Sequence, residues 1–321
     1  METATKFLSM ALAILIFVAV VGFILFIASR SERTSGKRVA FLFLLPTGIM
    51  LSIGLLYPAA RTIYYSFFNA AGDAFIGIAN YETIFGSSEQ LTVLRNTALW
   101  VLMTPFLATA IGLLYAILVD GARGEALSKA LIFLPMSISF VAASIIWKFM
   151  YAFRPDQGNI NQIGLINQIL VWIGVPPQQF LINAPWNTFF LIAVMIWIQA
   201  GFAMTILSAS IKAIPDDVIE AARLDGVSAI EMFRFVTMPA IRPSVVVVVS
   251  TIAIGTLKVF DVVRTMTGGQ FDTSVVANEF YSQSFRSDNQ GLGAALAVLL
   301  FVLVIPIVAY NVHQLRASEA R

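Results

Sequence analysis

The residues best suited to polar chemistry lie together in one stretch, 212–243, between two long apolar segments. Nine of its side chains are charged: Lys212, Asp216, Asp217, Glu220, Arg223, Asp225, Glu231, Arg234 and Arg242. Charged groups of this kind form short, strong hydrogen bonds with a partner of opposite charge. We therefore interpret the stretch as an exposed loop with structure of its own.

The loop contains the start and stop signals of a short helix. Pro215 suits the first helical position, so Asp216 and Asp217 would face the positive end of the helix dipole. Residues 218–224 can continue about two turns of helix. Gly226 then suits the left-handed residue that commonly ends a helix. These signals predict a first helix over 215–224.

A second helix is predicted to begin at Ser228, because the Ser-x-x-Glu spacing to Glu231 is that of a capping box. Pro239 is expected to end it. The two helices would leave an apolar face in need of a covering surface, made by Val218, Ala221, Ala222 and Leu224. A capped amphipathic connector lying at the lipid interface is an alternative explanation of the same features.

Residue types that perform catalysis or bind metals are scarce. The chain has no cysteine and one histidine, His313, which excludes cysteine chemistry and leaves too few ligands for a zinc site. No glycine-rich phosphate-binding motif is present. The ionisable residues deepest in an apolar segment are Lys258 and Asp261, whose i, i+3 spacing predicts a structural ion pair. We expect no catalytic residue, no metal site and no cofactor bound by this chain, which is predicted not to be an enzyme or to bind nucleic acid.

The composition indicates a chain that meets lipid. Of its 321 residues, 59% are hydrophobic and 12% charged, about half of the roughly 25% typical of soluble domains. Seven stretches are long and apolar enough to span a bilayer as helices: about 7–28, 40–60, 96–119, 127–150, 187–211, 244–263 and 291–312. The predicted fold is an all-α membrane protein, a polytopic bundle of about seven transmembrane helices.

The first stretch is followed by a basic segment, 29–39, which sets the expected orientation. The stretch is longer than a signal peptide's apolar region, so we expect a retained helix, with a cleaved signal as the alternative. Twelve of the twenty Lys and Arg residues lie on the same side as 29–39, seven on the other, and Lys258 within a span. Basic residues collect in cytoplasmic loops. This predicts an outside N-terminus and a cytoplasmic C-terminus.

The loop also carries a spaced motif. Glu220-Ala221-Ala222, Asp225-Gly226 and Pro239 resemble the E-A-A…D-G…P loop of the permeases of binding-protein-dependent ABC importers. Three letters alone would mean little, but the whole pattern between two spans is specific to that family.

Further motifs resemble the carbohydrate-uptake permeases of that family, closest to those of the maltose and α-glucoside type. They extend over residues 38–312: Tyr57-Pro58, the segment 75–81, Val259-Phe260-Asp261, Thr267-Gly268-Gly269, the segment 278–281 and the segment 291–295. The chain departs from the pattern at Gln270-Phe271, where most members have Gly-Pro. The shape of the 264–290 loop therefore need not follow the family.

The resemblance implies a domain organisation: an extra N-terminal helix with a basic linker (1–37), a six-helix permease domain (38–312) with a coupling loop (212–243), and a cytoplasmic tail (313–321). It implies that Glu220, Ala221, Ala222, Asp225, Gly226 and Pro239 couple the chain to a cytoplasmic ATPase dimer. ATP and Mg²⁺ would bind that ATPase. A second homologous permease subunit, forming a heterodimer, and an extracytoplasmic sugar-binding protein are the other implied partners, in a prokaryotic inner membrane.

The resemblance also implies a substrate path on the helices either side of the loop. Placed by distance from the motif, it falls on two sets of residues: Met195, Ile198, Gln199 and Phe202, and Ile252, Gly255, Thr256 and Val259. Each set has the spacing of one helical face. Ordinary helix packing would explain the same residues.

Two other classes of function remain to be compared. A self-sufficient secondary transporter or channel would use buried carboxylates or broken helices, and an intramembrane enzyme would use a cluster of polar residues at membrane depth. No Asp or Glu lies mid-span, and neither class explains the charged loop. The predicted function is that of the permease subunit of an ATP-driven importer for an α-glucoside-type di- or oligosaccharide. The identity of the sugar is not encoded in any feature of the sequence that we recognise.

Overall fold

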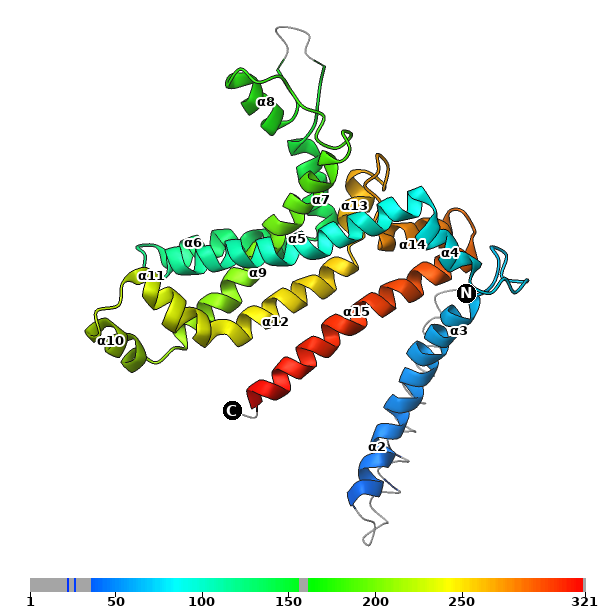
Figure 1. Ribbon diagram of the computed structural model, residues 1–321, viewed down its shortest axis with the longest axis horizontal. Helices are drawn as coiled ribbons and strands as arrows, with labels where there is room; N and C mark the ends of the chain where they lie inside the picture. The colour runs from blue at the N-terminus through cyan, green and yellow to red at the C-terminus, as the bar shows by residue number, and fades with distance from the viewer. Residues whose placement is uncertain (1–21, 23–25, 27–35, 156–160, 320–321) are drawn as a thin grey trace. The chain divides into compact units, whose positions relative to one another are not determined.

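The computed structural model describes residues 22, 26, 36–155 and 161–319 (Figure 1). These residues are mostly helical, and the only β pairing among them is a single bridge between Phe68 and Phe75. The predicted all-α class is confirmed. The chain divides into two units, 1–64 and 65–321, which are taken in turn.

The first unit contains three consecutive helical segments: α2 (Gly36–Leu51), the π-helical η1 (Ser52–Leu56) and α3 (Tyr57–Tyr65). The apolar part, Phe43–Tyr65, is long enough to cross a membrane. It corresponds to the predicted span 40–60. Apart from residues 22 and 26, the predicted helix 7–28 lies outside the described residues, as does most of the predicted segment 1–37.

The second unit contains the remaining helices. They are α4 (Ala79–Gly86), α5 (Ser88–Val119), α6 (Glu125–Phe133), the 3-10 segment η2 (Leu134–Ser137), α7 (Phe140–Met150), α8 (Leu165–Trp172), α9 (Trp186–Lys212), α10 (Asp216–Leu224), α11 (Ala229–Glu231), the π segment η3 (Met232–Thr237), α12 (Met238–Leu257), α13 (Asp261–Met266), α14 (Val276–Phe285) and α15 (Gln290–Glu319). The backbone of α15 continues as helix through most of the predicted tail 313–321.

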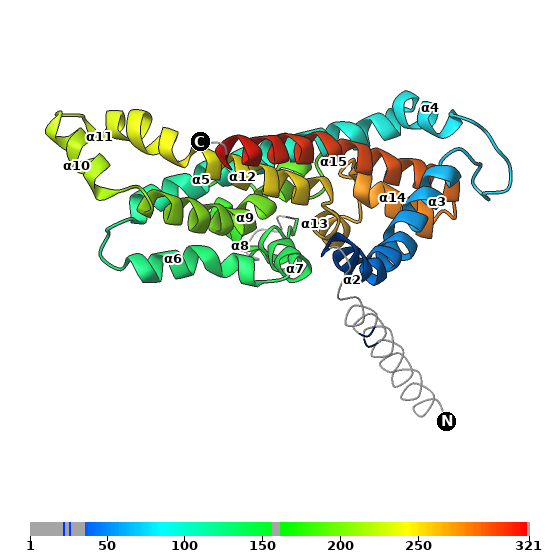
Figure 2. The same ribbon diagram turned by 90° about the horizontal axis from the view of Figure 1, so that it is seen from below.

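Three long helices form the body of this unit. In both views α5, α9 and α12 run side by side, with α10 and α11 at one end and α13 and α14 at the other (Figures 1 and 2). By length and composition, five described helices can cross a membrane: Phe43–Tyr65, Ser88–Val119, Trp186–Lys212, Ala229–Leu257 and Gln290–Val312. They correspond to five of the seven predicted spans.

The predicted span 127–150 is not one straight helix. Two segments, Glu125–Ser137 and Phe140–Met150, meet at an angle of 101°. Pro135 lies in the 3-10 turn that ends the first segment, and the Ser139 hydroxyl caps the second by accepting from the Ala142 N–H at 3.2 Å. Proline and a serine cap favour a helix boundary over continuation, so this stretch is a bent pair of helical segments.

The predicted span 244–263 also ends early. Helix α12 stops at Leu257, and Asp261 begins the separate helix α13. Val262 and Val263 of α13 are buried in the core. Because the helix breaks between them, Lys258 and Asp261 do not share a helical face, and no ion pair joins them in the part of the chain that is described. The predicted structural pair is wrong.

Close helix crossings hold the body together at glycines. A Cβ built on Gly112 of α5 would lie 2.5 Å from the Cβ of Ala203 and 2.7 Å from the backbone nitrogen of Met204, both on α9. One built on Gly201 of α9 would lie 2.5 Å from the carbonyl oxygen of Ile132 on α6. Small residues allow backbones in membrane bundles to approach in this way.

Candidate functional site

The predicted charged loop forms an exposed turn between α9 and α12 (Figures 1 and 2). Its first helix, α10, begins at Asp216, so Pro215 is the N-cap and lies one position earlier than predicted. Gly226 has φ of +77° and ends the turn, as predicted. Its N–H donates to the carbonyl of Arg223 at 3.1 Å. The local sequence signals therefore place this helix to within a residue.

The predicted capping box is also confirmed. The Ser228 hydroxyl accepts from the Glu231 N–H at 3.4 Å, and the Ser228 N–H donates to Glu231 Oε2 at 2.8 Å. The second helix does not end at Pro239, however, and this expectation was wrong. Helix continues from Ala229 to Leu257. Pro239 is the second residue of α12, directly after the π segment η3 and inside this continuous helix.

The loop presents charge and apolar area together. We call its exposed residues the loop surface: Val218, Glu220, Leu224, Ile230 and Phe235. Leu224 is 89% exposed and Ile230 79%. Across the described residues, the Glu220 carboxylate has no hydrogen bond or ion pair. Ala221 and Asp225 are also exposed and Ala222 is half-buried, so the whole E-A-A motif is accessible to a partner.

An ion cluster braces the base of this loop. Glu125, at the start of α6, accepts from Lys129 at 2.6 Å and from Lys212, the last residue of α9, at 2.5 Å. Lys129 also donates to the Ser208 hydroxyl at 2.5 Å, and Asp120 lies 3.5 Å from Lys212. These contacts tie the 120–125 turn to the end of α9. Asp120, Glu125 and Lys212 line a groove of about 890 Å³, and residues of α10 and η3 form its other walls.

Sequence reasoning missed this cluster. The Glu125–Lys129 spacing of i, i+4 was available as a signal. Lys212 joins the pair only through the tertiary fold, because 87 residues separate it from Glu125.

We expect Glu125→Gln to lower the melting temperature of the purified protein more than Lys212→Gln does. The Glu125 carboxylate pairs with both Lys129 and Lys212. Glu125→Gln therefore leaves the largely buried Lys129 without a carboxylate partner. In Lys212→Gln, by contrast, the Glu125–Lys129 pair remains. Thermal melts at low and high salt measure both effects, and salt should weaken the Lys212 contribution first because that side chain is half exposed. Equal shifts in the two variants would contradict a shared carboxylate.

The eight predicted substrate-path residues differ in burial: five are buried and three are at least partly exposed. Buried within the chain are Met195, Ile198, Ile252, Thr256 and Val259. The Thr256 hydroxyl donates to its own helix, at the Ile252 carbonyl, 2.7 Å away. Val259 lies beyond the end of α12. Accessible side chains remain at Gln199 and Phe202, which are half-buried, and Gly255 is exposed with nothing within 4 Å of a built Cβ.

The end of this unit opposite the charged loop contains the Thr267-Gly268-Gly269 motif and the motif at 278–281. Gly268 and Gly269 have φ of +70° and +84°, which glycine adopts without strain. The hydroxyls of Thr267 and Thr273 lie 2.7 Å apart and close the turn. A Cβ on Gly269 would lie 2.2 Å from the amide nitrogen of Asn278. The Thr-Gly-Gly motif therefore shapes a tight loop against α14.

The motif at 278–281 braces the same loop. Asn278 donates to the Ser274 hydroxyl at 3.0 Å. The buried Glu279 carboxylate accepts from Gln283 at 2.7 Å, from Ser274 at 3.3 Å and from Gln90 of α5 at 3.4 Å. Motif residues that the sequence identified only by resemblance thus hold the loop after α13 in a fixed shape.

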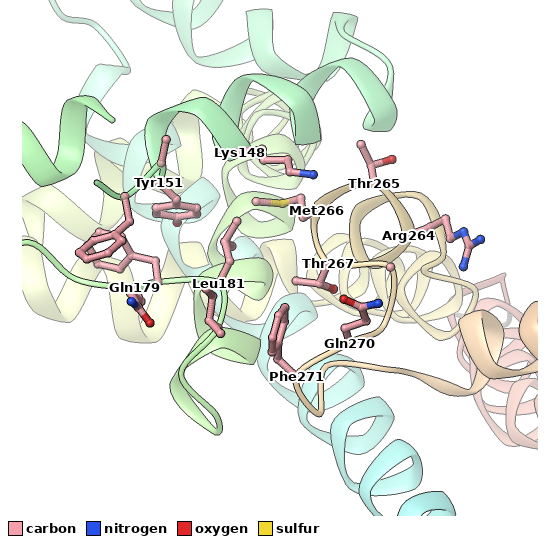
Figure 3. Close-up of a pocket in the computed structure, with 15 residues that line it drawn as sticks. Lys148, Tyr151, Gln179, Leu181, Arg264, Thr265, Met266, Thr267, Gln270 and Phe271 are labelled. Carbon is pink, nitrogen blue, oxygen red and sulfur yellow. The ribbon is translucent and has the colours of Figure 1, made fainter. Parts of the chain in front are cut away.

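This loop closes one side of a pocket of about 550 Å³ (Figure 3). The other side comes from the end of α7 and from 179–182, including Lys148, Tyr151 and Phe180. Tyr151 and Phe180 are buried and their rings lie 5.2 Å apart. Sequence reasoning did not select these residues, because only the fold brings the ends of α7 and α13 together.

The profile of one protein family matches residues 108–317, a stretch that contains the charged loop, α12 and the loop between α13 and α14. The family is described as "Binding-protein-dependent transport system inner membrane component". This chain belongs to that family. The permease is accordingly a multi-pass inner-membrane component of a transport system and not an enzyme, as predicted.

Relatives match the permease over most of its length. The osmoprotective compounds uptake permease protein GgtC of Synechocystis is 43% identical, with 87% of this chain and 99% of the relative covered. The alpha-glucoside transport system permease protein AglF of Rhizobium meliloti is 41% identical, with 89% and 85% covered. The trehalose/maltose transport system permease protein MalF of Thermococcus litoralis is 27% identical, with 84% and 90% covered.

A solved structure shares the fold. The crystal structure of a bacterial ABC transporter involved in the import of alginate contains a chain that aligns with a TM-score of 0.74 at 22% identity, covering 91% of the permease and 98% of that chain. The predicted permease fold and the predicted family are both confirmed.

Proposed function

We propose that the permease drives inward transport of a sugar by docking its loop surface on a cytoplasmic ATPase. The observation that carries this proposal is an exposed, capped helix turn with largely exposed Leu224 and Ile230 and with the Glu220 carboxylate, which has no partner among the described residues. Exposed apolar side chains beside a charged group offer a partner both contact area and a specific polar contact. A charge-assisted pair from Glu220 to a basic ATPase residue would fix the register of docking.

The ATPase supplies hydrolysis in this proposal. ATP and Mg²⁺ bind there, because this chain carries no phosphate-binding glycine motif. Movement of the ATPase reaches the transmembrane helices through α10 and through the helix that continues unbroken from Ala229 to Leu257. The ion cluster at Glu125 and Lys212 connects the same loop to α6 and α9.

The proposed substrate is an α-glucoside-type di- or oligosaccharide. Support comes from the relatives named for alpha-glucoside, trehalose/maltose and osmoprotective compound uptake. Gln199, Phe202 and Gly255 are the proposed path residues still accessible within the chain. Gln199 offers hydrogen bonds to hydroxyl groups and Phe202 an aromatic face. The buried members, such as Ile198 and Ile252, would support that surface from behind.

The proposed assembly has three further features. A second homologous permease subunit, forming a heterodimer, would complete the path across the membrane, and an extracytoplasmic sugar-binding protein would deliver the substrate. The loop surface and the C-terminus would lie in the cytoplasm, with the N-terminus outside, as the distribution of Lys and Arg predicts.

The assembled complex, reconstituted in liposomes with its binding protein, tests this function. We expect ATP hydrolysis to rise severalfold when the binding protein is loaded with an accepted sugar, and expect ATP-dependent accumulation of that sugar. A panel of maltose, trehalose, sucrose and glucosylglycerol, with lactose as a β-linked control, identifies the substrate. Stimulation by lactose alone would overturn the α-glucoside assignment. Uptake by the permease alone, without an ATPase, would favour a secondary transporter.

A further inference from the structure

Two consecutive residues of the loop between α13 and α14 have a strained backbone. Phe271 and Asp272 both have φ of +57°, the left-handed region that residues with side chains rarely adopt. A bulky residue such as phenylalanine is especially uncommon there. Such outliers persist only where the surroundings enforce them, and they gather at functional sites.

Two buried asparagines enforce this conformation. Asn187, at the start of α9, donates its amide to the carbonyl of Phe271 at 2.7 Å. Asn96 of α5 donates to the carbonyl of Asp272 at 2.5 Å and to that of Ser274 at 3.0 Å. Both asparagine side chains are at most 1% exposed. Transmembrane helices thus hold the loop backbone directly.

The constraint leaves the Phe271 side chain accessible. Phe271 is 46% exposed, although the hydrogen bond from Asn187 holds its backbone carbonyl. Figure 3 shows Phe271 and Gln270 on one side of the pocket, with Lys148 and Tyr151 on the other. This is the position at which the sequence departs from Gly-Pro in the permeases that it resembles. The chain therefore holds an aromatic ring at the pocket by means of a strained backbone.

The pocket has the composition of a carbohydrate site. The Phe271 ring offers a flat apolar surface, on which the C–H face of a pyranose can stack. The amides of Gln179 and Gln270 both donate and accept hydrogen bonds, and Lys148 adds a cationic donor. Its volume of about 550 Å³ lies within the range of small-ligand pockets, about 300–1,000 Å³. Seven of its fifteen lining residues are polar or charged, Arg264, Thr265 and Thr267 among them, and such a concave, mixed lining suits a small polar molecule.

We propose that this pocket is an external subsite that receives the sugar before it enters the membrane path, with Phe271 as its stacking platform. This proposal rests on the proposed function, because the proposed function places the loop surface in the cytoplasm. Helix α9 starts near the pocket and ends at Lys212, at the base of the charged loop, and its 27 residues span about 40 Å. The pocket then lies on the outer side, distinct from Gln199 and Phe202.

Conservative substitution of Phe271 in the complete complex tests the subsite. Leucine keeps apolar volume and a similar backbone strain but has no flat face, whereas tyrosine keeps the ring. With labelled sugar accepted by the wild-type complex, we expect Phe271→Leu to lower uptake per ATP hydrolysed by roughly threefold to tenfold, the worth of an aromatic stacking contact. Phe271→Tyr should retain it. ATPase stimulation by the loaded binding protein, and its half-saturating concentration, should stay unchanged.

Phe285→Leu is the matched control, an exposed phenylalanine of the same unit that does not line the pocket. It should leave uptake per ATP unchanged. Unchanged uptake in Phe271→Leu would overturn the subsite. A raised half-saturating concentration of the binding protein, with uptake and hydrolysis falling together, would identify a protein-docking surface and overturn it too. Failure of the proposed function looks different, because the wild-type complex would then show no sugar-stimulated hydrolysis.

Discussion

Glu220→Lys is expected to reduce sugar uptake at least tenfold while the permease stays folded in the membrane. The carboxylate is exposed and has no partner among the described residues, so its reversal leaves this chain's own contacts intact. In the assembled complex the new lysine would face the basic ATPase residue that we propose as its partner, and like charges at an interface disfavour association strongly. Uptake, ATP hydrolysis and co-purification of the ATPase measure the effect.

A control variant and a second loop variant test whether this effect is specific to the loop. Glu89→Lys makes the same charge reversal at the first turn of α5, about 45 Å along that helix from its other end at Val119, and should leave coupling unchanged. Gly226→Val should uncouple as well, because valine resists the φ of +77° that ends α10. Normal uptake in both Glu220→Lys and Gly226→Val would remove the basis for assigning this loop to coupling.

Gly112→Val is expected to cause the largest loss of folded protein. Even a Cβ at this position would lie 2.5 Å from Ala203 Cβ and 2.7 Å from the Met204 nitrogen. The obstacle on the α9 side includes backbone, which cannot rotate away, so α5 and α9 must separate. Overpacking of this kind typically costs about 1–3 kcal/mol, and two γ-methyl groups add to it. Size-exclusion profiles and thermal melts of detergent-extracted protein measure the loss.

Gly86→Val is the control for this substitution. Gly86 is also helical, but a Cβ there meets nothing within 4 Å. We expect a monodisperse protein with a melting temperature near that of the wild type. If Gly112→Val behaved in the same way, the close crossing of α5 and α9 would not describe the folded protein.

Local signals predicted the loop well because each acts over a few residues. The Ser228–Glu231 capping box and the left-handed Gly226 appear in the structure as expected. Proline was the unreliable signal. Pro135 helps to end a helical segment, whereas Pro239 lies near the start of α12, inside continuous helix. Whether a proline breaks a helix depends on the turn before it, and neither the π segment η3 nor the 3-10 segment η2 has a sequence signature that we recognised.

Local signals could not predict contacts between segments that are distant in the sequence. Asn96 and Asn187 are ordinary polar residues near the ends of two spans, and nothing in their neighbourhood indicates that they hold the Phe271–Asp272 backbone. The substrate-path prediction was limited for the same reason. Helical spacing placed Thr256 on a face with Gly255, but burial and a bond to Ile252 occupy its hydroxyl.

The sequence by itself determined that the chain is a helical membrane protein, which family it belongs to, and where its loop helices begin. Hydrophobic length, caps and spaced motifs are local properties, and they decide these features before the helices pack. Only the tertiary structure decided which motif residues are exposed, which brace a loop, and how a pocket forms around Phe271. Those outcomes depend on residues more than a hundred positions apart meeting in space, as the Asn96 amide meets the Asp272 carbonyl, and no single segment specifies such a meeting.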